Sequence, residues 1–558
     1  MFTVDTVHSS YLDPRVRRYV APTRIVWQSG GAPEIAGVDA LLKGGEEQAT
    51  LAAHPSCTLN FSVGGAAPGL LLDFGRELHG GIQIVTNGTK DNKPVKLRVR
   101  FGESVTEANG EPMNDHAIHD HQILVPWLGS HEVGNTGFRF VRIDMVEPGA
   151  TLEIRKIRAV FLYHDLPYRG SFRCSDARLN SIWQTGAYTV QLCLQDYLWD
   201  GIKRDRLIWV GDMHPETSVV AAVFGDSPIV RRSLDLIRDE TPLPKWMQGI
   251  SSYSIWWLLI HQQWYLHFGD EGYLAQQRGY LCGLTEQLLN CIGPDGSETL
   301  APWRFLDWPT SENPEAVHAG LHALLTLALQ AAVELCGPLG ESALREKCVD
   351  GLARLKQHIP VPGMSKQAAA LMALAGISDA NTANKTVLAQ DQLSGLSTFY
   401  GYYVLQARAK AGDYAGCLEV IRRYWGAMLD FGATTFWEDF DLAWTPDAVG
   451  IDQLVPPGKK CIHADFGKYC YKGLRHSLCH GWAAGPTAWL TEHVLGIKPL
   501  TPGCKTVRIA PNLVDLEWAE GSLPTPRGDI HVLHTRKQDG TINTTVDLPD
   551  GVKLAKAP

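Results

Sequence analysis

The chain has 558 residues, which is too long for one compact core and favours several domains. Hydrophobic residues make up 45% of it and charged residues 20%, a balance that is typical of globular proteins and argues against a disordered chain. The net charge is -9, from 51 Lys and Arg against 60 Asp and Glu. This balance lacks the basic surface that nucleic-acid binding needs, so we expect no nucleic-acid partner.

No targeting or membrane segment is expected. The start, Met1–Ser10, has neither a basic nor an apolar stretch, so it does not resemble a secretory signal. No apolar run reaches the roughly 18 residues of a membrane helix, and Leu321–Leu335 is predicted to be a buried helix. The 12 cysteines form no CxxC pair, which favours reduced thiols and a cytoplasmic location.

Residues 1–168 are predicted to form an N-terminal β-sandwich. Short alternating apolar runs between turn residues indicate strands. These runs are Leu70–Gly75, Gly81–Val85, Val95–Phe101 and Phe138–Ile143.

Residues 169–496 are predicted to be helical. Helical apolar spacing is clearest at Ser218–Phe224, Ala316–Cys336 and Tyr414–Leu429. Pro215 fits a first helical position, and Gly432 follows a helix that ends at Asp430. About a dozen such segments suit an (α/α)6 six-hairpin barrel. A solenoid is the alternative, but the segment has no repeat of fixed period.

Residues 497–558 return to strands and are predicted to form a small C-terminal β-sandwich. The expected strands are Thr506–Ile509, Asp529–His534 and Ile542–Val546. The predicted fold class is therefore multidomain α+β, with the helical barrel between two β domains.

The segment from Asp196 to Glu216 carries the strongest chemical signal. It holds five carboxylates, three cations and two tryptophans between two helical patterns. A carboxylic acid beside an aromatic wall is desolvated, which raises its pKa as a general acid requires. The alternative is a surface loop of solvated salt bridges, each worth about 0–1 kcal/mol.

The 17 tryptophans favour sugar binding, because pyranose C–H faces stack on flat apolar rings. Some of them are also expected in the core, as at Trp256–Trp257. Trp303 and Trp308 lie in a loop that contains prolines, and there we predict pocket walls. Trp437 directly precedes Glu438 and could shield it from bulk water. The Cys and His residues between Cys461 and His480 lack the close pairs of a zinc site, so no metal is expected.

The segment Asp200–Asp212 resembles the motif Asp-Cys-Pro-x-Arg-(Asp/Glu)-Arg-Leu-Gly-Trp-x-Gly-Asp of glycoside hydrolase family 78, the bacterial and fungal α-L-rhamnosidases. The matching residues are Asp200, Arg204, Asp205, Arg206, Leu207, Trp209, Gly211 and Asp212. Four further segments are similar to segments of that family and follow in the same order. They are Leu72–Glu77, Gly170–Asn180, Gly432–Glu438 and Ser477–His480 with the following Gly485-Pro486.

The resemblance implies an inverting hydrolysis of α-L-rhamnosides without a cofactor. It gives Asp205 the place of the general acid and Glu438 that of the general base. The places implied for substrate binding belong to Asp200, Arg204, Trp209, Asp212, Asp307, Trp308 and His480.

The motif differs from the family pattern at three points. Asp205 stands where most relatives have Glu, Gly201-Ile202 replaces Cys-Pro, and Cys479 replaces an Asn. Asp is one methylene shorter than Glu, so either the backbone lies closer to the glycosidic oxygen or the acid is another group. Glu216 is the nearest candidate. These differences indicate a divergent subgroup.

Two other functions stay open from the sequence. One is another (α/α)6 carbohydrate enzyme, such as a glucuronyl hydrolase or a phosphorylase. The other is a sugar-binding protein that has lost catalysis, although two opposed carboxylates argue against it. The expected substrate is a small rhamnoside or oligosaccharide, and the aglycone and the oligomeric state, a homodimer included, are undetermined.

Overall fold

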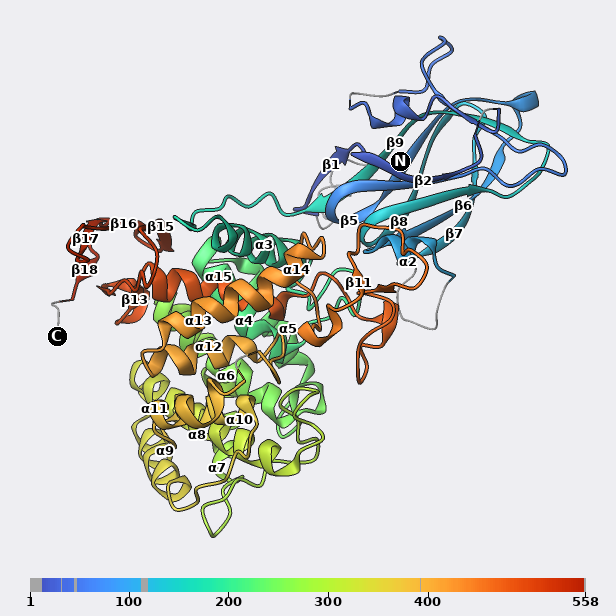
Figure 1. Cartoon of the computed structure of the whole chain (residues 1–558). Coiled ribbons are helices and arrows are strands. Elements are labelled where there is room, and N and C mark those ends of the chain that lie inside the picture. The colour runs from blue at the N-terminus through green and yellow to red at the C-terminus, as the bar shows by residue number, and fades with distance from the viewer. Residues whose placement is uncertain (1–12, 32, 45–47, 112–118, 392, 556–558) are drawn as a thin grey trace, which may run out of the picture. The chain divides into compact units, whose positions relative to one another are not determined.

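The computed structural model describes residues 13–31, 33–44, 48–111, 119–391 and 393–555. Within them the chain forms two compact units, one ending at Leu166 and one beginning at Pro167 (Figure 1). The second unit contains both the helices and the C-terminal strands. The division into three domains at residues 168 and 496 therefore stays a prediction.

The first unit is built on one nine-stranded antiparallel sheet. Seven strands follow in the order β3-β4-β9-β5-β8-β6-β7, while β1 pairs with β9 and β2 with β5. The strands are β1 (Val16–Val20), β2 (Arg24–Ser29), β3 (Ile35–Ala36), β4 (Cys57–Asn60), β5 (Gly69–Thr89), β6 (Val95–Gly102), β7 (Asp120–Val125), β8 (Gly129–Met145) and β9 (Thr151–Tyr163).

The long strand β5 replaces the two strands predicted at Leu70–Gly75 and Gly81–Val85. Its first part pairs with β2 and its later part with β9, while β8 follows it along the other edge. The register against β8 shifts between Asp73 and Leu78, and Gly75 adopts φ 84° there. A glycine at a bulge bends a ladder without ending it, which explains why one strand forms.

Asp73, in the segment Leu72–Glu77, ties three strands together. Its buried carboxylate accepts hydrogen bonds from Arg139 of β8 at 2.8 and 3.0 Å and from Arg24 of β2 at 2.9 Å. Burial raises the pKa of this carboxyl, but the hydrogen bonds and charge of Arg139 outweigh burial and leave the pKa lowered. This segment therefore has a structural role in the sheet.

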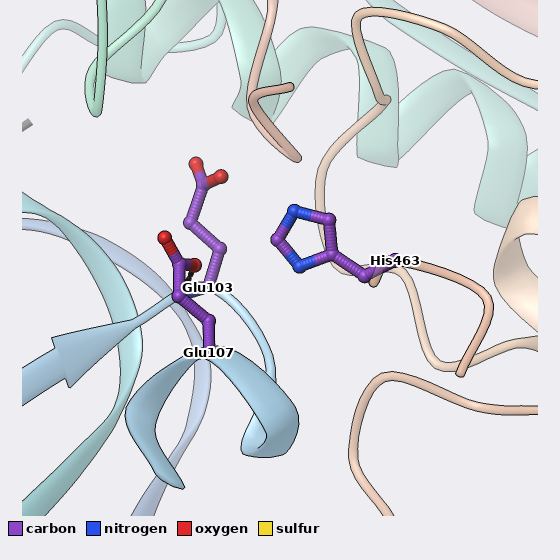
Figure 2. Close-up of side chains that lie close together, drawn as sticks. All are labelled: Glu103, Glu107 and His463. Atoms are coloured by element: carbon purple, nitrogen blue, oxygen red, sulfur yellow. Dashed lines mark hydrogen bonds between the residues drawn. The ribbon is translucent and has the colours of Figure 1, made fainter. Parts of the chain in front are cut away.

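The short helix α2 (Val105–Asn109) follows β6 and begins with a side-chain cap. Ser104 Oγ accepts the Glu107 N–H at 3.1 Å, and the Glu107 carboxylate accepts the Glu103 N–H at 2.8 Å. Figure 2 shows both glutamates at this helix. It also draws His463, a residue of the second unit, whose Nε2 lies 3.1 Å from the His476 carbonyl oxygen.

Helices make up most of the second unit (Figure 1). The main helical segments are α3 (Ala177–Cys193), α4 (Val210–Val223), α5 (Pro228–Glu240), α6 (Ser251–Phe268), α7 (Glu271–Leu289), α8 (Pro314–Leu339), α9 (Ser342–Leu355), α10 (Lys366–Ala375), α11 (Ala380–Ala383) with η4 (Asn384–Leu388), α12 (Gly401–Lys410), α13 (Tyr414–Val420) with η5 (Ile421–Trp425) and α14 (Gly426–Asp430), and α15 (Gly485–Trp489) with η9 (Leu490–Val494).

Helix α8 contains the stretch Leu321–Leu335 and is buried along most of its length, as predicted. It is the one helix of the described residues that is long and apolar enough to cross a membrane. It packs against α6, α7, α9 and α10, which is the setting of a core helix. Asn313 caps its first turn by accepting the Ala316 N–H at 3.1 Å.

Two helix boundaries were predicted from single residues. Gly432 does follow a helix that ends at Asp430, and it adopts φ 88°. The prediction for Pro215 was wrong, because α4 begins at Val210 and Pro215 lies inside it. Pro215 is the sixth residue of α4, beyond the four N–H groups that lack intrahelical partners, so its missing N–H removes one intrahelical hydrogen bond.

The C-terminal strands form two small sheets. Strand β10, which precedes the helices in the sequence, belongs to one of them. One sheet has the order β10-β15-β16-β17 and the other β13-β14-β18. Their bounds are β10 (Ser171–Cys174), β13 (Ile497–Pro499), β14 (Thr506–Ile509), β15 (Trp518–Thr525), β16 (Gly528–Arg536), β17 (Ile542–Asp547) and β18 (Lys553–Leu554). The three strands predicted here correspond to β14, β16 and β17.

Candidate active site

The loop between α3 and α4 is folded around the carboxylate of Asp200. Asp200 Oδ2 accepts the backbone N–H of Asp205 and its Oδ1 that of Leu207, both at 2.9 Å. The Asp200 N–H donates in turn to the Leu207 carbonyl at 3.0 Å. Charge-assisted bonds to two backbone N–H groups fix a loop firmly, so Asp200 determines where Asp205 lies.

Gly201 lets this loop approach the segment that carries His480. A Cβ at Gly201 would lie 2.8 Å from the Cys479 carbonyl oxygen and 2.9 Å from that of Arg204. Gly201 and His480 also form an isolated antiparallel bridge. Gly201, which stands where the family has Cys, therefore lies at a close contact between two backbone segments.

The loop forms part of the wall of a cavity of about 290 Å³. This volume is near the lower end of the range for small-molecule sites, roughly 300–1,000 Å³. Nine of the residues predicted for the site line it: Asp200, Arg204, Asp205, Trp209, Asp212, Trp303, Trp308, Glu438 and His480. Asp205 and Glu438, far apart in sequence, thus face one cavity.

The two oxygens of Glu438 have different surroundings. Oε2 accepts hydrogen bonds from Arg204 Nη2 at 2.7 Å and from the Ser477 N–H at 2.8 Å. No hydrogen bond from the described residues reaches Oε1, which lies 3.9 Å from His480 Nδ1. The side chain is 5% exposed. One oxygen is therefore anchored and the other is available to a small molecule in the cavity.

Asp205 is the more exposed of the two carboxylates, at 27% of its side chain. Its contacts are long: 3.4 Å from Arg204 Nη1 to Oδ1 and 3.3 Å from Trp209 Nε1 to Oδ2. Arg204 also donates through Nε to the Arg475 carbonyl. Its guanidinium therefore touches both Asp205 and Glu438 from a position fixed by the backbone.

His480 is buried between two carboxylates. Its Nε2 lies 2.9 Å from Asp212 Oδ2, and its Nδ1 faces Glu438 Oε1. Burial lowers the pKa of His480, but the negative charges of Glu438 and Asp212 outweigh burial and raise the pKa to about 9. His480 is accordingly an imidazolium at neutral pH.

The two buried aspartates have raised pKa values. Burial is the largest cause for Asp200, the charge of Asp212 adds to it, and the pKa rises to about 7. Burial also raises the pKa of Asp212, although the hydrogen bond and charge of His480 oppose the shift. The site therefore holds two buried carboxyl groups that bind a proton more tightly than an exposed aspartate does.

Aromatic rings form another part of the cavity wall. Trp303, Phe305 and Trp308 follow one another, with ring centroids 5.8 and 5.2 Å apart. Trp209 meets Tyr253 edge to face at 6.0 Å. Flat apolar faces beside charged groups suit a pyranose, which presents C–H faces and hydroxyls. Trp303 is 45% exposed and therefore lies at the opening.

The structure places three candidate residues away from the cavity wall. The buried carboxylate of Asp307 accepts hydrogen bonds from the Thr310 N–H at 3.0 Å and Ser397 Oγ at 2.9 Å. Trp437 is 1% exposed, and neither it nor Asp307 is among the lining residues. Glu216 is fully buried and does not line the cavity either. Burial raises its pKa well above the usual value.

Sequence reasoning missed seven lining residues: Ile250, Tyr253, Phe305, Cys470, Tyr471, Arg475 and Trp482. Phe305 lies two residues from Trp303, so the alternation of an extended chain could have found it. Trp482 lies two residues from His480 but in the short helix η8 (Gly481–Ala484), where this alternation does not hold. Tyr253 belongs to the first turn of α6, beside the buried pair Trp256–Trp257. Nothing in its local pattern separates it from the core.

Comparison with known proteins relates two segments of the chain to one enzyme family. The sequence model of the bacterial α-L-rhamnosidase six-hairpin glycosidase domain matches residues 167–343, and that of the bacterial α-L-rhamnosidase C-terminal domain matches residues 496–555. These two segments are therefore similar to domains of the bacterial α-L-rhamnosidases, which supports membership of glycoside hydrolase family 78. The predicted fold class is confirmed, with a six-hairpin domain between two sheet-forming regions.

Individual family members are distant from this chain. An α-L-rhamnosidase of Alteromonas sp. (strain LOR) is 24% identical over 541 residues, which cover 88% of this chain and 56% of the relative. The GH78 family rhamnosidase of Bacillus sp. GL1 superposes with a TM-score of 0.73 at 23% identity, covering 91% of this chain and 54% of that one. The chain thus spans little more than half of these two relatives.

A structure of closer length is the rhamnosidase from Klebsiella oxytoca with rhamnose bound. It superposes with a TM-score of 0.68 at 20% identity, covering 86% of this chain and 96% of that one. The fold described above is therefore also found in a rhamnosidase of similar length.

Proposed function

We propose that the chain hydrolyses terminal non-reducing α-L-rhamnosyl residues of small rhamnosides or oligosaccharides, with inversion at the anomeric carbon. One observation carries the proposal: Asp205 and Glu438 line the same cavity, and Arg204 contacts both. Inverting glycosidases use such a pair, one carboxyl group protonating the leaving oxygen and the other activating water. Family membership and the rhamnose bound to the Klebsiella oxytoca relative support the choice of sugar.

Glu438 acts as the general base. Arg204 and the Ser477 N–H hold Oε2, so Oε1 can accept a proton from the attacking water. Nδ1 of the His480 ring lies 3.9 Å from Oε1. As the water attacks the anomeric carbon, its proton passes to Glu438 and the glycosidic bond breaks.

Asp205 acts as the general acid and gives its proton to the departing glycosidic oxygen. Its side chain is partly exposed and Asp200 fixes its backbone N–H. The alternative acid, Glu216, is fully buried and is not among the cavity-lining residues. A proton on Glu216 would have no direct route to the leaving oxygen, so the geometry favours Asp205.

The test is hydrolysis of an aryl α-L-rhamnoside followed by proton NMR. We expect release of the phenol and β-L-rhamnose as the first anomer, because inversion converts an α linkage to a β product. The α anomer as first product would exclude inversion. Turnover that requires phosphate would indicate a phosphorylase, and rhamnose binding without turnover on any rhamnoside would indicate a binding protein.

Two variants test the roles. Glu438→Gln should keep rhamnose binding and lower kcat on every substrate by roughly 10²–10⁴-fold. Asp205→Asn should lose far less on aryl rhamnosides with an acidic phenol than on alkyl rhamnosides, since a good leaving group needs no protonation. The exposed Glu346→Gln, on α9, is the matched control. Equal losses of Asp205→Asn on both substrate types would exclude Asp205 as the acid.

We also propose that the protein works in a reducing compartment, the cytoplasm. The 12 cysteines all lie in the described residues and form no disulfide there, and nine of them are buried. Buried cysteines without disulfides are typical of proteins that are kept reduced.

A further inference from the structure

Arg475 is the one positively charged side chain of the cavity wall that forms no ion pair with a carboxylate of the described residues. The other two, Arg204 and His480, both contact carboxylates of the site. Arg475 Nη1 donates to the Cys470 carbonyl oxygen at 2.6 Å. A guanidinium carries five N–H donors, so Arg475 keeps further donors and its full charge for a ligand.

The backbone that carries Arg475 is anchored by two cationic side chains of the loop between α3 and α4. Lys203 Nζ donates to the carbonyl oxygens of Leu474 at 2.8 Å and of His476 at 3.0 Å. Arg204 Nε donates to the carbonyl oxygen of Arg475 between them. Three consecutive carbonyl groups are therefore held, so the side chain of Arg475 starts from a fixed position. A ligand that binds there loses little free energy to ordering of the backbone.

Burial shows which end of the cavity Arg475 occupies. The buried acidic and imidazole groups of the wall mark the closed end, and they are Asp200, Asp212, Glu438 and His480. Arg475 and Asp205 are partly exposed and lie toward the opening, where Trp303 also lies. A pocket that removes a terminal sugar holds this sugar at its closed end. The aglycone then lies at the open end, beside Arg475.

The charge of the wall determines what Arg475 can select. Four carboxyl groups line the cavity, and they are Asp200, Asp205, Asp212 and Glu438. Like charges repel more strongly in a partly enclosed site than in water, so these groups alone would disfavour an anionic substrate. A guanidinium binds a carboxylate through two parallel N–H···O bonds, which provide both affinity and orientation. An unpaired Arg475 beside the aglycone therefore fits a carboxylate better than a hydroxyl.

We propose that Arg475 binds a carboxylate of the aglycone and so selects rhamnosides whose leaving group is a uronic acid. The proposal rests on the proposed function, because it takes the terminal sugar to be a rhamnosyl residue at the closed end. Arg475 is a specificity-determining residue: it holds the leaving group, while the proton still comes from Asp205. A neutral aglycone loses this contact and binds through the aromatic part of the wall.

The test compares pairs of disaccharides that differ in one group. Both members carry a terminal α-L-rhamnosyl residue on sulfur, one on a hexuronic acid and the other on the corresponding hexose, so that only a carboxylate and a CH₂OH group differ. The sulfur link resists hydrolysis, and calorimetry therefore gives Kd whether or not the protein is an enzyme. Pairs with each linkage to the hexose are needed, because the linkage determines where the carboxylate lies.

We expect the wild type to bind the uronate of one pair at least tenfold more tightly than its neutral partner at low salt. The preference should decrease at high salt, because salt screens the charge of a partly exposed side chain. Arg475→Gln should abolish or reverse the preference, since the carboxyl groups of the wall then face the uronate alone. The neutral disaccharide is the internal reference, because a disturbed loop would weaken both ligands alike.

Two further variants sharpen the test. Arg475→Lys keeps the charge but not the two parallel donors, so it should keep only part of the preference. The exposed Arg345→Gln, on α9, is the matched control and should show the full preference.

The proposal would be overturned by equal Kd values within every pair, or by an undiminished preference in Arg475→Gln. The proposed hydrolysis fails separately: in that case the wild type shows the preference in binding but does not turn over the aryl α-L-rhamnoside.

Discussion

At the residue scale, the buried charges around Glu438 balance one another. Arg204 and His480 carry positive charge, and Glu438 and Asp212 carry negative charge, within direct contact distances of 2.7–3.9 Å. Buried charges are tolerated only when they are paired in this way. A substitution at any one of them leaves a partner unpaired, so its effect on stability has to be separated from its effect on turnover.

His480 gives this charge balance a pH dependence. Its pKa is raised to about 9 in the folded protein, from about 6.5 in the unfolded chain. The resulting stabilisation, about 3 kcal/mol, is fully present below pH 6.5 and is lost as pH rises through about 9. We expect urea unfolding to show this decrease for the wild type between pH 7 and 9.5 and not for His480→Gln. The same decrease in both proteins would contradict the raised pKa.

Single residues also show which parts of the site could be predicted from the sequence and which could not. Five of the residues in Asp200–Asp212 that the family resemblance implies for the site line the cavity. Asp307 was expected beside Trp308 but turns to the Thr310 N–H and Ser397 Oγ. Ser397 is 90 residues away in sequence, so no local pattern could reveal this partner.

At the element scale, the loop between α3 and α4 owes its shape to one side chain. Both Asp200 oxygens accept backbone N–H groups, and the Asp200 carbonyl accepts the Gly481 N–H at 2.8 Å. The sequence motif assigned Asp200 to the sugar hydroxyls. The structure adds a second role, because the same carboxylate holds the residue that we propose as the acid.

Asp200→Asn separates these two roles. An amide can accept through only one atom, so one backbone N–H loses its partner, at a cost of about 1–3 kcal/mol. If Asp200 acts by positioning Asp205, kcat should fall most on alkyl rhamnosides while KM changes little. A large rise in KM at nearly constant kcat would instead indicate a direct bond to the sugar. The exposed Asp350→Asn, on α9, serves as the control.

At the scale of the whole second unit, the segments before and after the helices are joined in one sheet. β10, which leads directly into α3, pairs with β15, about 350 residues later, with Ser171 opposite Ser522 and Cys174 opposite Ala519. The sequence analysis predicted neither β10 nor β15 as a strand, and a four-residue strand carries no register signal of its own from which the pairing could be predicted. The pairing of β10 with β15 therefore joins the segments that precede and follow the helices.

Gly521 makes this pairing testable. A Cβ at this position would clash with the Ser171 carbonyl oxygen and lie 2.6 Å from a methyl group of Leu495. Gly521→Ala should therefore push β15 from β10 and lower the free energy of unfolding by about 1–3 kcal/mol, measured by urea denaturation.

The control is Gly279→Ala in the middle of α7, where a Cβ meets no atom within 4 Å. Alanine is the better helix former, so this variant should be neutral or more stable by up to about 1 kcal/mol. The cavity contains neither glycine, so kcat at 25 °C should be unchanged in both variants. If Gly521→Ala unfolded at the same urea concentration as Gly279→Ala, the β10–β15 contact would contribute nothing to stability. The helical unit would then be held together by its helix packing alone.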